Sequence, residues 1–275
     1  MERRDLQGFT VVNLGSGGDA PFALPPWARS GSTLVEIDAA DRPASSAGNY
    51  EHRLTLADTV AGSAGTREFT TRSFVSVSGL LEPKPELVQK YALQEYFGVV
   101  ERKLVRTRTL PSMLAEHGIE HVDLLKTDLE GMDLEVLLAS GRFLDGAYCV
   151  QCELRFEPFY EGEPKFHDAL AALDARGFDL LSLSTETWQP ATPHRTTLVH
   201  GRDGQTAWAD CILIRRLGAG DVVGRARQVV LLSGLAQRAV AAYLLGTIAD
   251  RIAREGRDLL EPLVTPVAPP ADDSQ

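Results

Sequence analysis

Short apolar runs alternate with helical patterns along most of the chain. Runs of strand length lie at residues 9–14, 33–37, 53–56, 122–125, 147–154, 179–184 and 210–215. Apolar side chains at helical spacing follow two of these runs, at residues 134–138 and 165–176. Strands that alternate with helices are typical of a parallel sheet covered on both faces. The pattern therefore predicts an α/β fold with a mostly parallel, doubly wound sheet of seven strands.

A polar insertion interrupts this alternation after the third strand. Residues 67–74 and 103–109 each alternate polar and apolar side chains, which predicts that they pair as a β-ribbon. Residues 75–100 lie between them and include two prolines and a predicted helix at 86–96. A long insertion over the carboxyl edge of a sheet suits a lid or a substrate loop.

The composition changes after residue 216, where we place the end of the α/β domain. Residues 221–260 carry Ala, Leu, Val and Arg at helical spacing, which predicts a helical pair within a C-terminal extension at 217–262. The run 229–248 is apolar, but Arg238 lies in its middle and costs roughly 2.5–3.5 kcal/mol on membrane insertion. We therefore expect a soluble extension that packs on the sheet or on a second copy of the chain. Residues 263–275 are expected to form a disordered tail.

Charge and cysteine content exclude several classes of function. The net charge of −10 argues against a nucleic acid partner, because binding to phosphates needs a basic face. Cys149 and Cys152 have the Cys-x-x-Cys spacing, but they lie in a predicted strand, where residues three apart point to opposite faces. A buried structural role is therefore expected in place of zinc or redox chemistry. The N-terminus has no apolar signal core, so a cytoplasmic protein is expected.

The first three predicted strands end in residues typical of a nucleotide site. A glycine-rich turn follows the first strand and lets backbone N–H groups approach a ligand closely. An acidic residue after the second strand is placed to accept hydrogen bonds from a ribose diol. The residues expected to contact the ligand are Gly15, Ser16, Gly17, Gly18, Asp38 and Asp58. Each piece also has a structural alternative: the glycines could form an ordinary loop, and Asp38 could begin a turn.

A charged turn follows the fourth predicted strand. Lys126, Asp128 and Glu130 lie between that strand and the next helix, and Gly131 allows a tight turn. Ligands of open α/β sheets bind beyond the carboxyl ends of the strands, where this turn is expected. The alternative is an ordinary solvated loop.

The order of these features resembles the FkbM family of S-adenosylmethionine-dependent methyltransferases. Residues 123–137 are similar to the Lys-Ile-Asp-Val-Glu-Gly signature of the family, with its flanking strand and helix. Weaker similarities lie at Thr109-Leu110, at residues 76–83, and at Glu153 with the loop 156–164, which resembles a Tyr-x-Gly-x-Pro loop. The resemblance covers residues 9–215, and only the central motif is specific.

The resemblance implies a Rossmann-like class I methyltransferase fold, S-adenosylmethionine as cofactor, and O-methylation of a sugar, glycan or secondary metabolite. Asn13 stands where the family usually has an acidic residue that contacts the amino acid part of the cofactor. An alcohol needs a base that removes its proton, and a carboxylate or histidine can supply one. The candidate catalytic residues are Lys126, Asp128, Glu130, Glu153 and His167, with Asp128 or Glu130 favoured as the base. Clustered carboxylates could also bind Mg²⁺ or Ca²⁺, although their spacing matches no fixed ligand pattern, so no metal is expected.

Two rival functions fit parts of the same pattern. The glycines followed by Asp38 also suit an NAD(P)-dependent oxidoreductase, although the full Gly-x-Gly-x-x-Gly spacing and a Tyr-x-x-x-Lys pair are missing. A methyltransferase fold without activity, acting as a binding module, is the second rival, and Asn13 is the residue that suggests it.

Overall fold

The structure, a computed structural model, describes residues 3–15, 24–39, 50–194, 197–201, 203–248 and 254–264. Three residues of the predicted glycine turn, Ser16, Gly17 and Gly18, lie outside these ranges. The same holds for residues 265–275 of the predicted tail.

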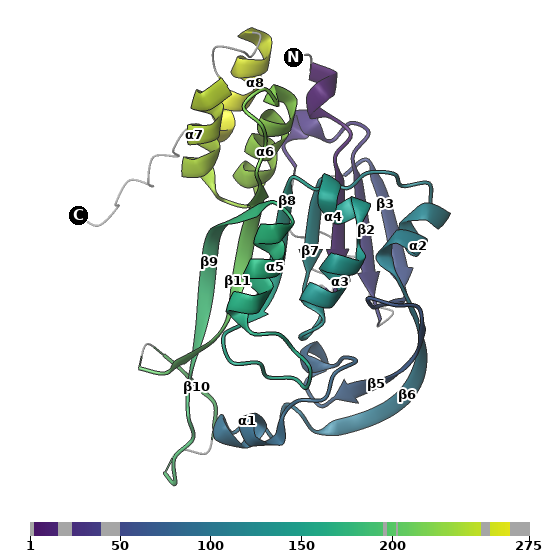
Figure 1. Ribbon diagram of the computed structural model, residues 1–275, viewed down its shortest axis with the longest axis vertical. Helices are drawn as coiled ribbons and strands as arrows, with labels where there is room; N and C mark the ends of the chain where they lie inside the picture. The colour runs from purple at the N-terminus through teal and green to yellow at the C-terminus, as the bar shows by residue number, and fades with distance from the viewer. Residues whose placement is uncertain are drawn as a thin grey trace, which may run out of the picture.

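A large mixed sheet forms the centre of the molecule, with strand order β10-β9-β11-β8-β7-β1-β2-β3 (Figure 1). The strands are β1 (Thr10–Leu14), β2 (Thr33–Asp38), β3 (His52–Ala57), β7 (Leu124–Thr127), β8 (Cys149–Arg155), β9 (Phe178–Gln189), β10 (Val199–His200) and β11 (Gln205–Arg215). Neighbours from β3 to β8 are parallel, whereas β11 is antiparallel to both β8 and β9. The prediction of a mostly parallel α/β sheet is therefore confirmed.

The predicted number of seven strands is wrong, because the sheet of the described residues has eight. The extra strand is the two-residue β10, which pairs with the end of β9 through Val199 and Gln189. It arises where polar residues at the end of β9 and the start of β11, at 185–188 and 205–208, continue the ladder between these two strands. Polar side chains do not prevent this pairing, because backbone groups make the hydrogen bonds of the ladder.

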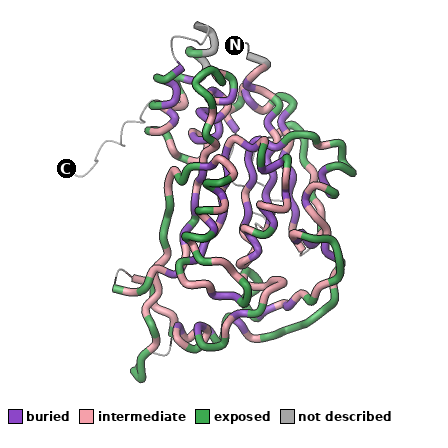
Figure 2. The backbone as a smooth tube through the Cα atoms, in the orientation of Figure 1, coloured by how far each residue is buried: buried purple, intermediate pink, exposed green. Residues whose placement is uncertain are grey.

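Helices cover both faces of the sheet, and side chains of the strands alternate between them. Val12 packs in the core under α2 (Leu110–Glu116), α3 (Asp133–Ala139), α4 (Arg142–Gly146) and α5 (Phe166–Ala175). Its neighbour Val11 packs in the opposite core with the short helices η1 (Arg3–Leu6) and η2 (Pro26–Ala28) and with α6 (Val222–Gly234). The buried strands lie between these two layers (Figure 2). Cys149 and Cys152 fall in different cores, as predicted for a strand.

The polar insertion forms a second, three-stranded sheet beyond the carboxyl ends of the central strands (Figure 1). Strands β5 (Gly65–Arg72) and β6 (Val99–Arg108) pair antiparallel, which confirms the predicted ribbon, and β4 (Thr59–Val60) joins β6. The connection contains η3 (Val75–Val77) and α1 (Pro85–Lys90). Helix α1 ends earlier than predicted, because Ala92 adopts a left-handed backbone with φ of +55°.

The C-terminal region forms three helices, α6, α7 (Arg238–Ile248) and α8 (Arg254–Val264), in place of the predicted pair. The apolar run 229–248 is split between α6 and α7, with Ala236 at φ of +59° in the break. Among the described residues, no helix has the length and apolar character needed to cross a membrane. The three helices gather near the amino-terminal ends of the parallel strands, away from the β5–β6 ribbon (Figure 1). The boundary at 216 and the packing of a second copy stay predictions.

Candidate active site

The turns that follow four parallel strands are joined by backbone hydrogen bonds. The N–H of Gly15 donates to the carbonyl oxygen of Ile37 at 3.0 Å, and the N–H of Asp128 donates to that of Leu14 at 3.0 Å. The N–H of Asp58 donates to the carbonyl oxygen of Asp38, also at 3.0 Å. The ends of β1, β2, β3 and β7 therefore form one continuous edge.

This edge lies at the topological switch point of the sheet. From β1 the chain steps outward to β2 and β3, whereas from β7 it steps outward to β8 on the other side. Doubly wound sheets usually bind their ligands beyond the carboxyl ends of the strands at such a point, which here lies between β1 and β7.

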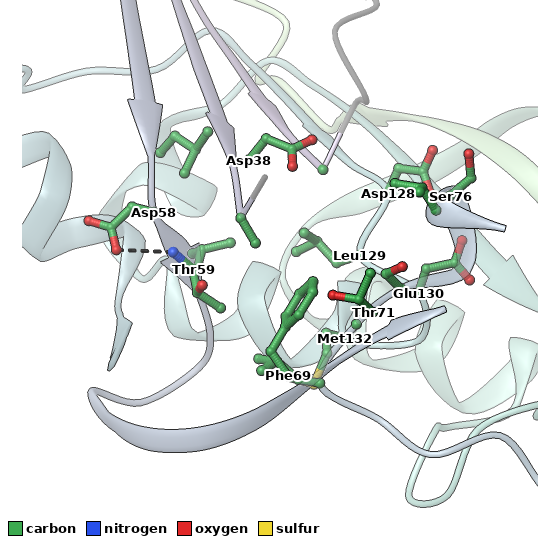
Figure 3. A pocket seen from close by; sticks show the side chains of 18 of the residues that line it. Asp38, Asp58, Thr59, Phe69, Thr71, Ser76, Asp128, Leu129, Glu130 and Met132 are labelled. Carbon is green, nitrogen blue, oxygen red and sulfur yellow. Dashed lines mark hydrogen bonds between the residues drawn. The ribbon is translucent and has the colours of Figure 1, made fainter. Parts of the chain in front are cut away.

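A cavity of about 340 Å³ opens over this edge (Figure 3). Five of the predicted site residues line it: Gly15, Asp38, Asp58, Asp128 and Glu130. The opposite wall comes from the insertion, through residues such as Phe69, Thr71 and Ser76. The segment predicted as a lid thus borders the cavity, and its closing movement stays a prediction. The volume falls in the range of small-molecule sites.

The cavity combines an apolar wall with acidic groups. Apolar side chains are contributed by Ile37, Val60, Phe69, Leu80 and Met132. Four carboxylates border the same space, and Lys103 is the cation among the described lining residues. Asp58 is also paired with Arg108, at 3.0 Å between the carboxylate and the guanidinium. This composition suits a ligand with a flat apolar part and a positively charged or hydroxyl-bearing part.

Gly15 has no room for a side chain. Its φ is +72°, and a Cβ atom there would lie 2.0 Å from the carbonyl oxygen of Asp128. Gly118 has a similar φ of +67°, but nothing lies within 4 Å of its added Cβ.

We expect Gly15→Ala to lower the free energy of unfolding by about 1–3 kcal/mol more than Gly118→Ala. Both variants carry the strain of a left-handed alanine, which costs roughly 1–2 kcal/mol. Only Gly15→Ala adds a collision with backbone. Urea unfolding of the two variants measures the difference, and equal losses would show that the turns after β1 and β7 separate easily.

Lys126 and Asp128 lie at the carboxyl end of β7. The Lys126 ammonium is 4.0 Å from the Asp128 carboxylate, and the side chain of Asp128 is 44% exposed. Lys126 itself does not line the cavity in the described residues. Asn13 is buried in β1, in register between Glu36 of β2 and Lys126 of β7, so it supports the cavity edge from inside the sheet.

Glu130 is held by two donors on one carboxylate oxygen. The Tyr160 hydroxyl donates to Oε2 at 2.5 Å, and Nη2 of Arg155 donates to the same atom at 2.9 Å. Burial raises the pKa of Glu130 to about 7, although the Arg155 guanidinium opposes this shift and Asp128 adds to it. A carboxylate with such a pKa can accept and release a proton near neutral pH.

Arg155 is the centre of a buried group of carboxylates. It is 6% exposed, and it pairs with Glu153 at 2.5 Å and with Glu163 at 3.1 Å as well as with Glu130. Burial raises the pKa of Glu153 well above its usual value. Glu153 lies beside Glu130, because both carboxylates pair with Nη2 of Arg155. Glu153 does not line the cavity.

Sequence reasoning missed Arg155 and Tyr160. Arg155 follows Glu153 by two positions in a strand, and residues two apart in a strand point to the same face of the sheet. Tyr160 belongs to the aromatic and acidic loop 156–164 that the family resemblance had already marked. These two signals could have found the cluster.

His167 lies apart from this cluster. Its side chain is 74% exposed at the start of α5, where it is 3.5 Å from Asp168. In the described residues it does not line the cavity. Across the part of the chain that the structure describes, no group of three or more His, Cys, Asp or Glu residues is arranged to hold a metal ion.

Comparison with known proteins identifies the central part of the chain. No curated protein matches the sequence. Among solved structures, the Streptococcus pneumoniae protein Sp1610, a candidate tRNA (m1A22) methyltransferase, is 12% identical, with a TM-score of 0.32 over 94% of this chain and 90% of that chain. A structure from work on the conversion of a disulfide bond into a thioacetal group during echinomycin biosynthesis is 12% identical, with a TM-score of 0.28 over 78% of each chain. TM-scores of this size do not establish a shared fold.

A family comparison is more informative. Residues 48–180 match the methyltransferase FkbM domain, and this range contains β7, the charged turn and β8. It also contains Asp58, Asp128, Glu130 and Arg155, whereas Gly15 and Asp38 precede it. Residues 48–180, just under half of the chain, therefore match the FkbM methyltransferase domain, the family whose signature residues 123–137 resemble.

Proposed function

We propose that the protein is an S-adenosylmethionine-dependent O-methyltransferase that acts on a hydroxyl group of a sugar, a glycan or a secondary metabolite. One observation carries this proposal: a single cavity is bordered both by Gly15, Asp38 and Asp58 and by Asp128 and Glu130. The first group suits an adenosine, and the second suits the transfer chemistry.

The residues of the cavity fit the cofactor. Asp38 ends β2, where a carboxylate can accept hydrogen bonds from a ribose diol. Ile37, Leu80 and Met132 offer apolar surface for a flat base. The close backbone at Gly15 leaves no side chain in the way, and Asp128 gives a negative charge that suits a sulfonium. When bound, the cofactor supplies a methyl group whose bond to sulfur breaks as the acceptor oxygen takes it, leaving S-adenosylhomocysteine.

Glu130 is the better candidate for the base. Its carboxylate is held in place and its pKa is raised, so it can take the proton of the acceptor hydroxyl. Asp128 is more exposed and lies against the turn of Gly15, which suits contact with the cofactor. Lys126, 4.0 Å from Asp128, orients that carboxylate.

The pH dependence of turnover follows from the raised pKa of Glu130. The base form of Glu130 is the carboxylate, and burial raises its pKa to about 7, so the base form is lost as the pH falls through 7. We therefore expect kcat/KM to decrease about tenfold per pH unit on the acid side, with a midpoint near pH 7. Rates of methyl transfer from pH 5 to 9 give this profile, and a flat profile down to pH 5 would exclude Glu130 as the base.

The acceptor class rests on the same turn and on charge. The segment from Asp128 to Gly131 has no Pro-Pro-aromatic sequence of the kind that clamps a flat amine of a nucleic acid base. The net charge of −10 also disfavours a polyanionic acceptor. A neutral hydroxyl compound therefore suits the site best.

Transfer of a labelled methyl group tests the proposal. The protein is incubated with ¹³C-methyl-labelled S-adenosylmethionine and panels of monosaccharides, glycans and polyketide lactones, and mass spectrometry locates the label. We expect a gain of one methyl group on oxygen. Cofactor binding without transfer to any panel would favour an inactive binding module, and transfer to nitrogen would overturn O-methylation.

A further inference from the structure

Glu130 has an unusual backbone for a residue with a long side chain. Its φ is +50°, in the left-handed region. Glycine adopts this region without a steric cost, but a residue with a Cβ atom does not. Residues held in strained backbone persist only where their surroundings fix them, and they concentrate at functional sites. The contacts of Glu130 must therefore offset the strain.

The two contacts that fix Glu130 converge on one atom. Tyr160 and Arg155 both donate to Oε2, at 2.5 Å and 2.9 Å. Among the residues that the structure describes, neither donor contacts Oε1. One oxygen is thus fixed, and the other stays available to an acceptor hydroxyl.

Tyr160 is itself rigidly placed. It is 1% exposed and packs in an apolar cluster whose buried members are Leu87, Tyr91, Leu93, Phe97, Phe159 and Tyr160. Its backbone N–H donates to the Glu163 carboxylate at 3.0 Å, and a Cβ atom added to Gly131 would lie 3.0 Å from its ring. The turn of Glu130 and Gly131 therefore lies directly against the Tyr160 ring.

Arg155 is fixed in the same way. Its guanidinium lies 5.2 Å from the centre of the Tyr160 ring and pairs with Glu153 and Glu163. A planar guanidinium can bind several carboxylates at once in a set geometry, which a lysine cannot do. Arg155 and Tyr160 thus come from one buried unit.

We propose that Arg155 and Tyr160 are positioning residues that hold Oε2 of Glu130 and leave Oε1 to receive the proton of the acceptor hydroxyl. This inference rests on the proposed function, in which Glu130 is the base, because it names the residues that hold Glu130 in place. Neither residue needs to touch the acceptor. Both act through Glu130.

Tyr160→Phe tests the inference with the loss of one oxygen atom. The hydroxyl stabilises the Glu130 carboxylate, so its removal makes the carboxylate harder to form. In protein labelled with ¹³C at the glutamate carboxyl, we expect the NMR titration midpoint of Glu130 to rise by about one pH unit. The Glu130 signal is assigned by its disappearance in Glu130→Gln.

Tyr91→Phe is the matched control. Tyr91 is also 1% exposed, and its hydroxyl donates to a carboxylate, that of Glu157, at 2.6 Å. This variant removes the same atom from the same apolar cluster without touching Glu130, so its Glu130 midpoint should equal that of the wild type. Equal midpoints in Tyr160→Phe and the wild type would overturn the inference. If Tyr160→Phe does not fold, Arg155→Lys provides the second variant, and an unchanged midpoint there has the same meaning.

The kinetic consequence separates this inference from the proposed function. We expect the acid limb of kcat/KM for methyl transfer to move upward with the NMR midpoint in Tyr160→Phe, while the KM for the cofactor stays unchanged. If the wild-type protein transfers a methyl group to none of the acceptors, the proposed function is wrong. If the wild type transfers a methyl group and the acid limb of kcat/KM is identical in Tyr160→Phe and Tyr91→Phe, only the positioning role is wrong.

Discussion

Glu130→Gln is expected to lower the turnover of methyl transfer by about 10²- to 10⁴-fold, which is the usual contribution of a positioned general base. Glutamine keeps the size of the side chain and can still accept the hydrogen bonds of Arg155 and Tyr160 on its oxygen. It cannot accept the proton of an alcohol. Initial rates with saturating cofactor and acceptor measure the loss.

Glu161→Gln is the control for this experiment. Glu161 is exposed on the loop that contains Tyr160, and it does not line the cavity. We expect its turnover to stay within about twofold of the wild type, since surface substitutions have small effects. Should Glu130→Gln also keep wild-type turnover, the base would be Asp128 or Glu153. The amide substitutions Asp128→Asn and Glu153→Gln would then distinguish these two residues.

Arg227→Ala is expected to lower the free energy of unfolding by about 3–5 kcal/mol, because it removes the guanidinium that pairs with a buried carboxylate. Asp123 is fully buried before β7, and Nε and Nη2 of Arg227 lie 2.8 Å and 2.7 Å from its Oδ1. Nη1 of Arg227 also donates to the carbonyl oxygens of Asp5 and Gln7. One side chain of α6 thus joins the N-terminal segment to the sheet.

Urea unfolding followed by circular dichroism measures this loss. Arg225→Ala is the matched control, because Arg225 lies on the same helix and donates to the carbonyl oxygen of Leu217 at 3.1 Å. We expect it to cost about 1 kcal/mol, the usual net value of one hydrogen bond. Equal losses in the two variants would show that Asp123 finds water or another partner when Arg227 is removed.

Local sequence signals predicted the sheet and most of its edge. The buried strand, the charged turn and the helix of residues 122–138 are adjacent in the sequence, so their pattern sufficed. The ribbon was also predictable, because alternation over 67–74 and 103–109 reports on one polar and one apolar face. The lengths of α1 and of the C-terminal helices were not predictable from the sequence. Ala92 and Ala236 adopt left-handed backbone angles, and alanine rarely adopts them.

The candidate site was predictable only in part, for a physical reason. Asp38, Asp58 and Asp128 end parallel strands, so the topology alone brings them to one edge. The support of Glu130 depends on a loop 30 residues farther along the chain, which packs against α1 and the β9 strand. Such contacts between distant segments leave no periodic pattern. His167 shows the converse, because a residue type that could act as a base lies at the start of α5 and still faces solvent.

Isothermal titration calorimetry tests the central claim most directly, because it asks which nucleotide the cavity binds. The protein is titrated with S-adenosylhomocysteine and with NAD, and Asp38→Asn is titrated in parallel. We predict one-to-one binding of S-adenosylhomocysteine, no binding of NAD, and about 10- to 100-fold weaker binding of S-adenosylhomocysteine to Asp38→Asn, as expected for loss of a charged hydrogen bond. Binding of NAD without binding of S-adenosylhomocysteine would contradict the account.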